Sequence, residues 1–128
     1  MSTLARTTGA PNRDNTGANL AYDFQQPAFA STIALVLKKD NTLVQPAQLT
    51  GVVTFTANVG TGTADRIPPF VGQRVRFLLQ SDGTSRVVTF GTGFAPNGTL
   101  SVTTAKFATI GFIFNGTVWQ ETGRTTTA

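Results

Sequence analysis

Cysteine and histidine are both absent from this chain of 128 residues. Without cysteine there is no disulfide framework, no thiol nucleophile and no cluster held by thiolates. Without histidine the chain lacks the commonest metal ligand and the one side chain whose ordinary pKa lies near neutrality. Most enzyme classes depend on one of these residues, so we expect no enzyme activity, no metal site and no cofactor.

Charged residues are also scarce, at 12% of the chain. The six acidic residues fall mostly in predicted turns or near the N-terminus, which favours turn and solubility roles over a catalytic carboxylate pair. The ten basic residues are scattered along the chain, and we therefore expect no nucleic acid partner. Arg74 and Arg76 share one side of a predicted strand, which leaves a groove for single-stranded nucleic acid as a less favoured alternative.

Long apolar runs are missing as well. The sequence contains neither the apolar core of a signal peptide nor a stretch of about 18 apolar residues that could span a bilayer. We therefore expect synthesis in the cytoplasm and no membrane partner. Two Asn-Gly-Thr motifs, at Asn97 and Asn115, match the glycosylation pattern, but without a secretion signal we interpret them as turns.

Valine and isoleucine, which favour strands, are absent before Ile33, whereas all 15 of them lie between Ile33 and Val118. We therefore divide the chain into an extended N-terminal arm, residues 1–29, and a β-sandwich domain, residues 30–128. The arm is polar and buries too little apolar surface to order itself in isolation. Either it is a flexible leader or, as we favour, another protein chain holds it. Its sparse apolar residues would then be the partner-binding anchors: Leu4, Leu20, Tyr22, Phe24 and Phe29.

Alternating apolar and polar residues predict short strands from residue 32 onward. The predicted ranges are 32–38, 52–59, 74–79, 86–90, 100–104, 105–114 and 117–124. The third and fourth ranges predict a hairpin around Asp82-Gly83, and the last two predict a hairpin with a type I′ turn at Asn115-Gly116. Together with 23 threonines and 13 glycines, this pattern predicts an all-β fold, an antiparallel β-sandwich of jelly-roll-like type.

The strand before the last turn has apolar residues on both of its faces. Ile110, Phe112 and Phe114 face one way, while Ile113 faces the other. The second face would be covered by a loop, the arm or a neighbouring subunit, or it would belong to a wider core, and the pattern favours neither. The candidate subunit contacts are Phe107, Ile113 and Trp119. As an alternative, Trp119 or the loop at residues 61–72 would bind a sugar.

Three segments carry a pattern that extends over the last two strand pairs. They are VGQRVRFLLQSD at residues 71–82, VTFGTGF at residues 88–94 and FIFNGTVW at residues 112–119. This pattern resembles the small β-sandwich proteins of tailed bacteriophage particles, in particular the capsid decoration (cement) proteins and the head-fibre proteins.

The resemblance implies a structural protein of the virion that is made in the host cytoplasm and located on the capsid exterior. Its partners would be the major capsid protein, whose lattice it would bind and stabilise, and itself, as a homotrimer. The N-terminal arm would clamp adjacent capsid subunits. Similar segments occur in tail parts, so the alternative is a tail-fibre or baseplate domain that binds a host glycan or another virion protein.

Overall fold

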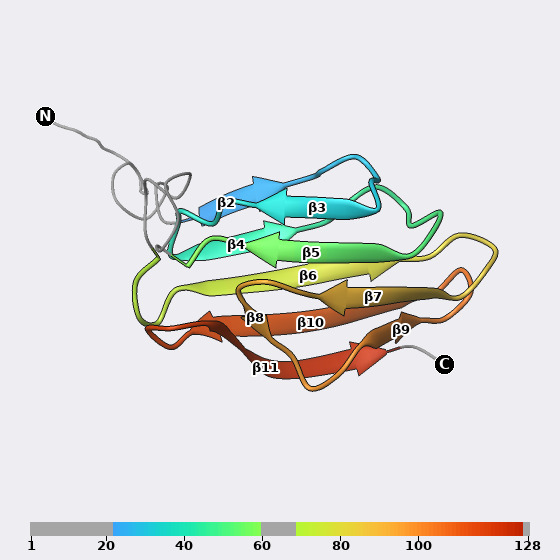
Figure 1. Cartoon of the computed structure of the whole chain (residues 1–128). Coiled ribbons are helices and arrows are strands. Elements are labelled where there is room, and N and C mark those ends of the chain that lie inside the picture. Colours follow the sequence, from blue (N-terminus) through green and yellow to red (C-terminus); the bar gives the residue numbers. More distant parts are fainter. Residues whose placement is uncertain (1–21, 60–68, 127–128) are drawn as a thin grey trace, which may run out of the picture.

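The computed structural model describes residues 22–59 and 69–126, and every helix or strand within these ranges is a β-strand. The strands are β2 (Tyr22–Gln25), β3 (Thr32–Leu35), β4 (Asn41–Val44), β5 (Val53–Ala57), β6 (Arg74–Gln80), β7 (Arg86–Phe90), β8 (Phe94–Ala95), β9 (Leu100–Val102), β10 (Phe107–Phe114) and β11 (Trp119–Thr126). They form a six-stranded sheet, β2-β4-β6-β10-β11-β8, and a four-stranded sheet, β3-β5-β7-β9, which pack face to face (Figure 1). The prediction of an all-β, two-layer fold is confirmed.

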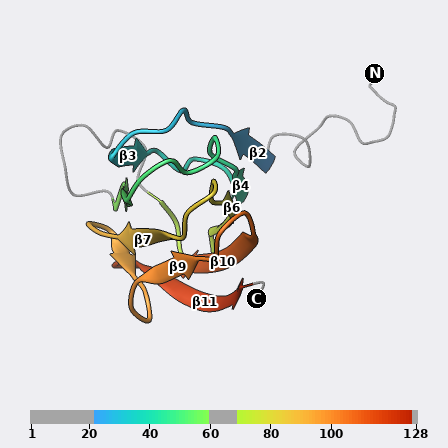
Figure 2. The same ribbon diagram turned by 90° about the vertical axis from the view of Figure 1, so that its right-hand side faces the viewer.

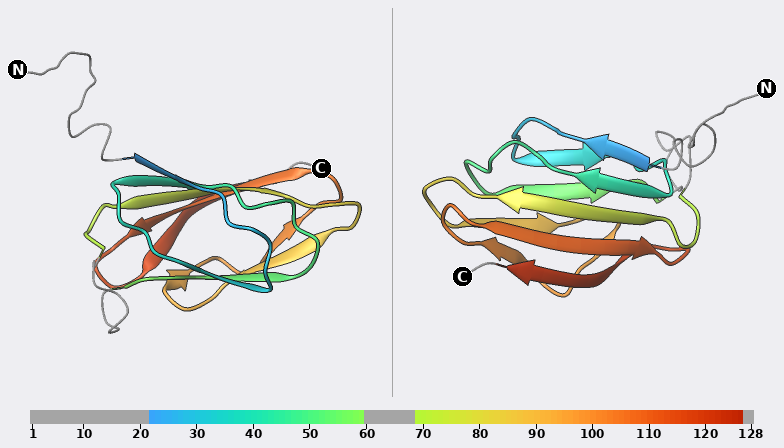
Figure 3. Two further views of the ribbon diagram at one scale, coloured as in Figure 1. Left: turned by 90° about the horizontal axis from the view of Figure 1, so that it is seen from above. Right: turned by 180° about the vertical axis from the view of Figure 1, so that it is seen from behind.

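The first six strands alternate between the two sheets. Figure 2 shows β3 and β7 on one side of the molecule and β4, β6 and β10 on the other, and the view from above shows the chain winding between the layers (Figure 3). As a result β2, β4 and β6 pair in parallel in one sheet, and β3, β5 and β7 pair in parallel in the other. The sheets are therefore mixed, and the predicted antiparallel pairing is wrong for these strands.

The connections explain this winding. Each of them carries the chain across to the opposite layer instead of folding it back in the same sheet. Pro27 and Pro46 lie in two of these connections, where a residue without an N–H cannot donate to a strand ladder. No Asn-Gly or Asp-Gly turn occurs between residues 25 and 53 to favour a tight hairpin. The jelly-roll-like strand order is not confirmed by this topology.

The predicted hairpin of β6 and β7 is wrong, because the two strands belong to different sheets. Other parts of the chain hold the residues between them. The Asp82 N–H donates to the Leu49 carbonyl oxygen (3.1 Å), and the Ser81 hydroxyl donates to the Thr103 carbonyl oxygen (2.6 Å). These contacts lead the chain out of the six-stranded sheet and into the four-stranded one.

The hairpin of β10 and β11 is confirmed, and β10 also pairs antiparallel with β6. The predicted type I′ turn is wrong, since Gly116 has a φ of 102° whereas Asn115 does not have a positive φ. The Asn115 side chain instead accepts hydrogen bonds from the N–H groups of Thr117 (2.9 Å) and Val118 (3.0 Å). The turn is therefore closed both by the Asn115 N–H, which donates to the Val118 carbonyl oxygen (3.0 Å), and by the asparagine side chain.

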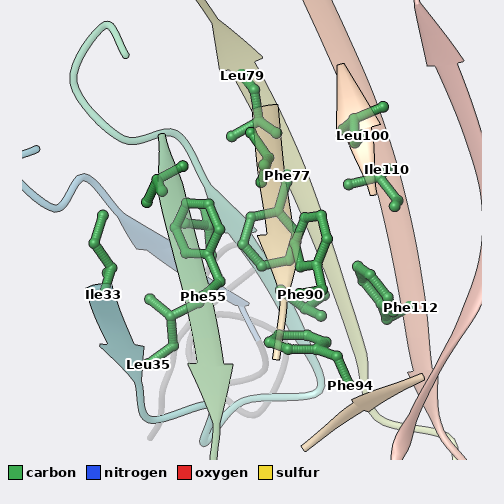
Figure 4. Close-up of a cluster of buried hydrophobic side chains, with 14 of the residues drawn as sticks. Ile33, Leu35, Phe55, Phe77, Leu79, Phe90, Phe94, Leu100, Ile110 and Phe112 are labelled. Carbon is green, nitrogen blue, oxygen red and sulfur yellow. The ribbon is translucent and has the colours of Figure 1, made fainter. Parts of the chain in front are cut away.

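Five phenylalanine rings from both sheets form the centre of the core (Figure 4). They are Phe55, Phe77, Phe90, Phe94 and Phe112. Ring centroids in contact lie 4.7–5.9 Å apart, with tilted, stacked and edge-on geometries that aromatic pairs favour. With Phe114 and Trp119, which are also buried, the core contains more than half of the aromatic side chains. Their inward alternation in the sequence predicts this.

Candidate binding surface

A shallow hollow of about 340 Å³ lies on the outer face of the six-stranded sheet. Residues of five different strands line it, among them Tyr22, Leu43, Arg74, Arg76, Gly111 and Thr122. Strand pairing explains how residues so distant in sequence come together. In each of the pairs β2–β4, β4–β6 and β6–β10, outward side chains stand next to one another across the sheet.

Two rows of outward residues cross the sheet at this place. The first row is Tyr22, Asn41, Arg74 and Ile113, and the second row is Phe24, Leu43, Arg76 and Gly111. Arg74 and Arg76 are two residues apart on β6 and exposed on the same face, as the sequence predicts. Each guanidinium group therefore has an apolar neighbour in its row, Ile113 or Leu43.

Gly111 contributes no side chain to the lining of the hollow. A Cβ atom here would lie 3.0 Å from the Thr122 hydroxyl oxygen, which is closer than an ordinary contact. The pairing of β10 with β11 shifts at this point, because Gly111 faces Gly123 while Phe112 faces Glu121. Thr122 is the extra residue of a β-bulge. The bulge and the glycine together produce the space beside Arg76.

Two other arginines form ion pairs, and the Glu121–Arg124 pair also binds the backbone of Asn97, Gly98 and Thr99 in a neighbouring loop. Arg86 binds both carboxylate oxygens of Asp82 (2.9 Å each), and Arg124 binds both carboxylate oxygens of Glu121 (2.7 and 2.9 Å). These side-chain hydrogen bonds are the main reason why the pKa values of Asp82 and Glu121 are lowered. Both pairs are neutral overall and hold their loops in place, which is a structural role.

Arg74 and Arg76 differ from that pattern. Neither forms an ion pair with any residue in the ranges that the structure describes. Within the described part of the chain the hollow therefore has two guanidinium groups that form no ion pair, on an outward surface that also contains the half-exposed Tyr22 ring. Guanidinium groups in such a setting bind carboxylate or phosphate oxygens through charge-assisted hydrogen bonds.

The residues predicted as arm anchors do not lie together in the structure. Tyr22 and Phe24 lie on β2, at the edge of the six-stranded sheet, and are 53% and 44% exposed. Phe29 is partly buried against the core instead, with its ring beside Gly51. Leu4 and Leu20 lie outside the described residues, as do residues 61–68 of the predicted sugar-binding loop. Tyr22 and Phe24 are thus brought to the arginine surface.

The residues predicted as subunit contacts are not brought together. Trp119 is completely buried, and its indole N–H donates to the Asn58 carbonyl oxygen (2.9 Å). Ile113 and Phe107 are both on β10, the former half-buried and the latter 42% exposed. They are six residues apart, which separates them by about 20 Å along the strand. Trp119 is therefore a core residue of the single chain, and its ring is not accessible for stacking on a sugar.

Sequence reasoning missed the hollow because it predicted neither β2 nor, above all, β4. This strand has four residues and no clear alternation, yet it lies between β2 and β6 and brings Leu43 beside Arg76. One signal was present in the sequence. Gly111 lies inside the largely apolar segment FATIGFIF, and a glycine inside a strand often marks a bulge or a close approach.

We also searched the described residues for a metal site and for a membrane-spanning helix. No group of three or more acidic residues lies in position to hold a metal ion within residues 22–59 and 69–126. In the same ranges there is no helix with the length and apolarity needed to cross a membrane. Comparison with protein-family models, with curated proteins and with solved structures finds no match for this chain.

Proposed function

We propose that this protein is a structural virion protein, a decoration protein that binds and stabilises the major capsid protein lattice of a tailed bacteriophage. The sequence resemblance at residues 71–82, 88–94 and 112–119 supports this class. The structural observation that carries the proposal is the position of β2. This strand belongs to the predicted N-terminal arm and is one of the two described edge strands of the six-stranded sheet, with Tyr22 and Phe24 about half exposed.

An edge strand of this kind is suited to attachment. Among the described residues β2 pairs only with β4, so its other backbone edge is open to an additional strand. Four residues of added ladder and two exposed aromatic rings contribute little in a single copy. In the proposed trimer, linked copies would engage adjacent lattice positions at once, and this linkage turns a weak contact into a stable attachment. The role is mechanical and requires no catalytic group.

The arm is tested by removing residues 2–21 and measuring binding to capsids that lack their decoration protein. We expect binding to fall at least about tenfold, since the leader that continues from the edge strand is lost. The matched control keeps the length and composition of residues 2–21 but scrambles their order. Undiminished binding of the deletion variant contradicts a role for residues 2–21, and undiminished binding of a Tyr22→Ser, Phe24→Ser variant contradicts a role for β2.

The location and the predicted trimer need separate measurements. Antibody labelling of intact particles distinguishes the head surface from the tail, where the alternative fibre or baseplate role would place the protein. Light scattering of the purified chain measures its mass, for which we expect three copies. The buried position of Trp119 does not favour the sugar-binding form of the alternative.

A further inference from the structure

We infer that the hollow above Gly111 binds an extended acidic segment of a partner protein, with one carboxylate on Arg74 and a second on Arg76. This inference rests on the proposed function, because it names the chemistry of the partner that the six-stranded sheet would meet. The argument depends on spacing, charge and shape at the hollow.

Spacing is the first argument. Arg74 and Arg76 project from the same face of β6 and are two residues apart, which is about 7 Å along a strand. An extended peptide has the same repeat, so its residues i and i+2 also project to one side at about 7 Å. A segment that lies along β6 with acidic residues at i and i+2 therefore meets both guanidinium groups at once.

Charge is the second argument. The other two described arginines are each paired with a carboxylate of this chain, Arg86 with Asp82 and Arg124 with Glu121. The two arginines of the hollow have no such partner among the residues that the structure describes. Carboxylates from outside would supply the missing acceptors in the two-pronged geometry that the internal pairs already use.

Shape is the third argument. Gly111 leaves room beside Arg76, and the hollow is open enough to admit a segment from solvent. Leu43 lies next to Arg76 and Ile113 next to Arg74, while Tyr22 stands at the β2 side of the hollow. These side chains provide apolar contact for the stems of glutamate residues and for an apolar residue between them.

The same surface fits single-stranded nucleic acid less well. Such binding uses several exposed aromatic rings together with a track of basic residues. Tyr22 lines the hollow at its rim and Phe24 lies beyond Leu43 in the same surface, whereas the neighbouring Phe112 is buried in the core, so two exposed rings are available. The described lysines do not line the hollow, so its basic track consists of two arginines.

The chain offers a specific reporter for this surface. Tyr22 is its only tyrosine, so incorporation of 3-fluorotyrosine places a single ¹⁹F nucleus at the hollow. Trp119 is the only tryptophan and is fully buried, so its emission reports whether a variant is folded. The probe is a ten-residue capped peptide of alternating glutamate and serine. Its controls are the peptide with glutamine in place of glutamate, and a ten-nucleotide oligothymidylate.

Two double variants separate local from general electrostatics. Arg74→Glu with Arg76→Glu reverses the charges of the hollow. Lys38→Glu with Lys106→Glu changes the formal charge by the same amount at exposed positions that do not line it. If the arginine variant shows altered Trp119 emission, Arg74→Gln with Arg76→Gln takes its place.

We expect the acidic peptide to shift the ¹⁹F signal and to lose affinity steeply when salt is added. The arginine variant should bind about tenfold more weakly, and the lysine variant within about threefold of the natural chain. Equal losses in both variants, equal binding of the glutamine peptide, or tighter binding of the oligothymidylate would each overturn the inference. Capsid attachment is read in a different assay, so a failed deletion experiment contradicts the proposed function without changing this titration.

Discussion

Gly93 lies where the backbone passes close to the backbone of Ala57. It has a φ of 95°, and a Cβ atom at this position would collide with the Ala57 carbonyl oxygen at the end of β5. The Gly93 carbonyl also accepts a hydrogen bond from the Trp119 N–H (2.8 Å). We therefore expect Gly93→Ala to lower the free energy of unfolding by about 3 kcal/mol or more. Urea unfolding followed by Trp119 fluorescence measures the change.

Two other glycines separate the collision from the backbone conformation. Gly98 has a φ of 94° but open space around its Cβ position, so Gly98→Ala should cost about 1 kcal/mol. Gly123 has neither a positive φ nor a neighbour within 4 Å, and its replacement by alanine should change little. Equal losses for Gly93→Ala and Gly98→Ala would show that the contact with Ala57 is not decisive.

Glu121 links stability to pH. Its buried carboxylate accepts hydrogen bonds from Arg124 and from the Asn97 N–H (2.7 Å), and chiefly the Arg124 hydrogen bonds lower its pKa below the ordinary 4.5. A carboxyl group with a lowered pKa in the folded state stabilises the fold above the unfolded pKa, and this contribution is lost as the pH falls through the folded value. Acidification below 4.5 should therefore weaken the fold.

We expect Glu121→Gln to cost about 2 kcal/mol at pH 7, because a charge-assisted pair is lost and the Arg124 guanidinium keeps an imperfect partner. The cost should shrink as the pH approaches the folded pKa, since the natural carboxyl group then becomes neutral as well. Urea midpoints of both proteins between pH 7 and pH 3 test this. A cost that stays constant over the whole range would contradict the assignment. Asp82→Asn, at a more exposed pair, should show a smaller effect.

At the scale of elements, the β10–β11 turn depends on one carboxamide. Asn115 and Asn97 both begin an Asn-Gly-Thr motif, but only the Asn115 side chain accepts hydrogen bonds from described backbone N–H groups. We expect Asn115→Ala to lower the free energy of unfolding by about 1 kcal/mol and Asn97→Ala by less than about 0.5 kcal/mol. Thermal unfolding of the two variants makes the comparison. A similar loss in both would attribute the effect to the motif rather than to the side chain.

Alternation predicted which side chains face the core, but it could not predict which strands are neighbours. Val53, Phe55, Val75 and Phe77 are buried as their two-residue period indicates. The same period is compatible with a hairpin and with a crossing to the other sheet. The choice depends on contacts between distant residues, such as Asp82 with Leu49, that leave no local pattern. For this reason the predicted hairpin of β6 and β7 was wrong.

The candidate surface could be predicted only in part for the same reason. That Arg74 and Arg76 share a face follows from their spacing. Their closeness to Tyr22 follows from the parallel register of β2, β4 and β6, which no turn signal encodes. The hollow also depends on the bulge at Thr122, where the register of β10 and β11 shifts. A glycine within a strand indicates such a place without showing what lies across from it.

At the scale of the whole molecule, the winding begins with β2 and β3, each of which has one described strand neighbour. The sequence division at residues 29 and 30 would remove β2 from the folded unit. Yet residues 22–29 contribute the β2 ladder to β4, the Phe29 ring over Gly51, and carbonyl oxygens that accept from the N–H groups of Gln45 (2.9 Å) and Ala47 (3.0 Å). These contacts make the first part of the winding a structural element.

Two truncations therefore test where the folded unit begins. Removal of residues 2–21 leaves every described core residue in place, and we expect the free energy of unfolding to change by less than about 0.5 kcal/mol. Removal of residues 2–29 also deletes β2 and the Phe29 ring, which should cost about 2 kcal/mol or more. Urea unfolding of both chains, followed by Trp119 fluorescence, measures the difference. Equal stability of the two would instead place the start of the folded unit after residue 29.

The expected result means that a chain lacking residues 2–21 is folded, so any loss of capsid binding that it shows is a loss of attachment and not of structure.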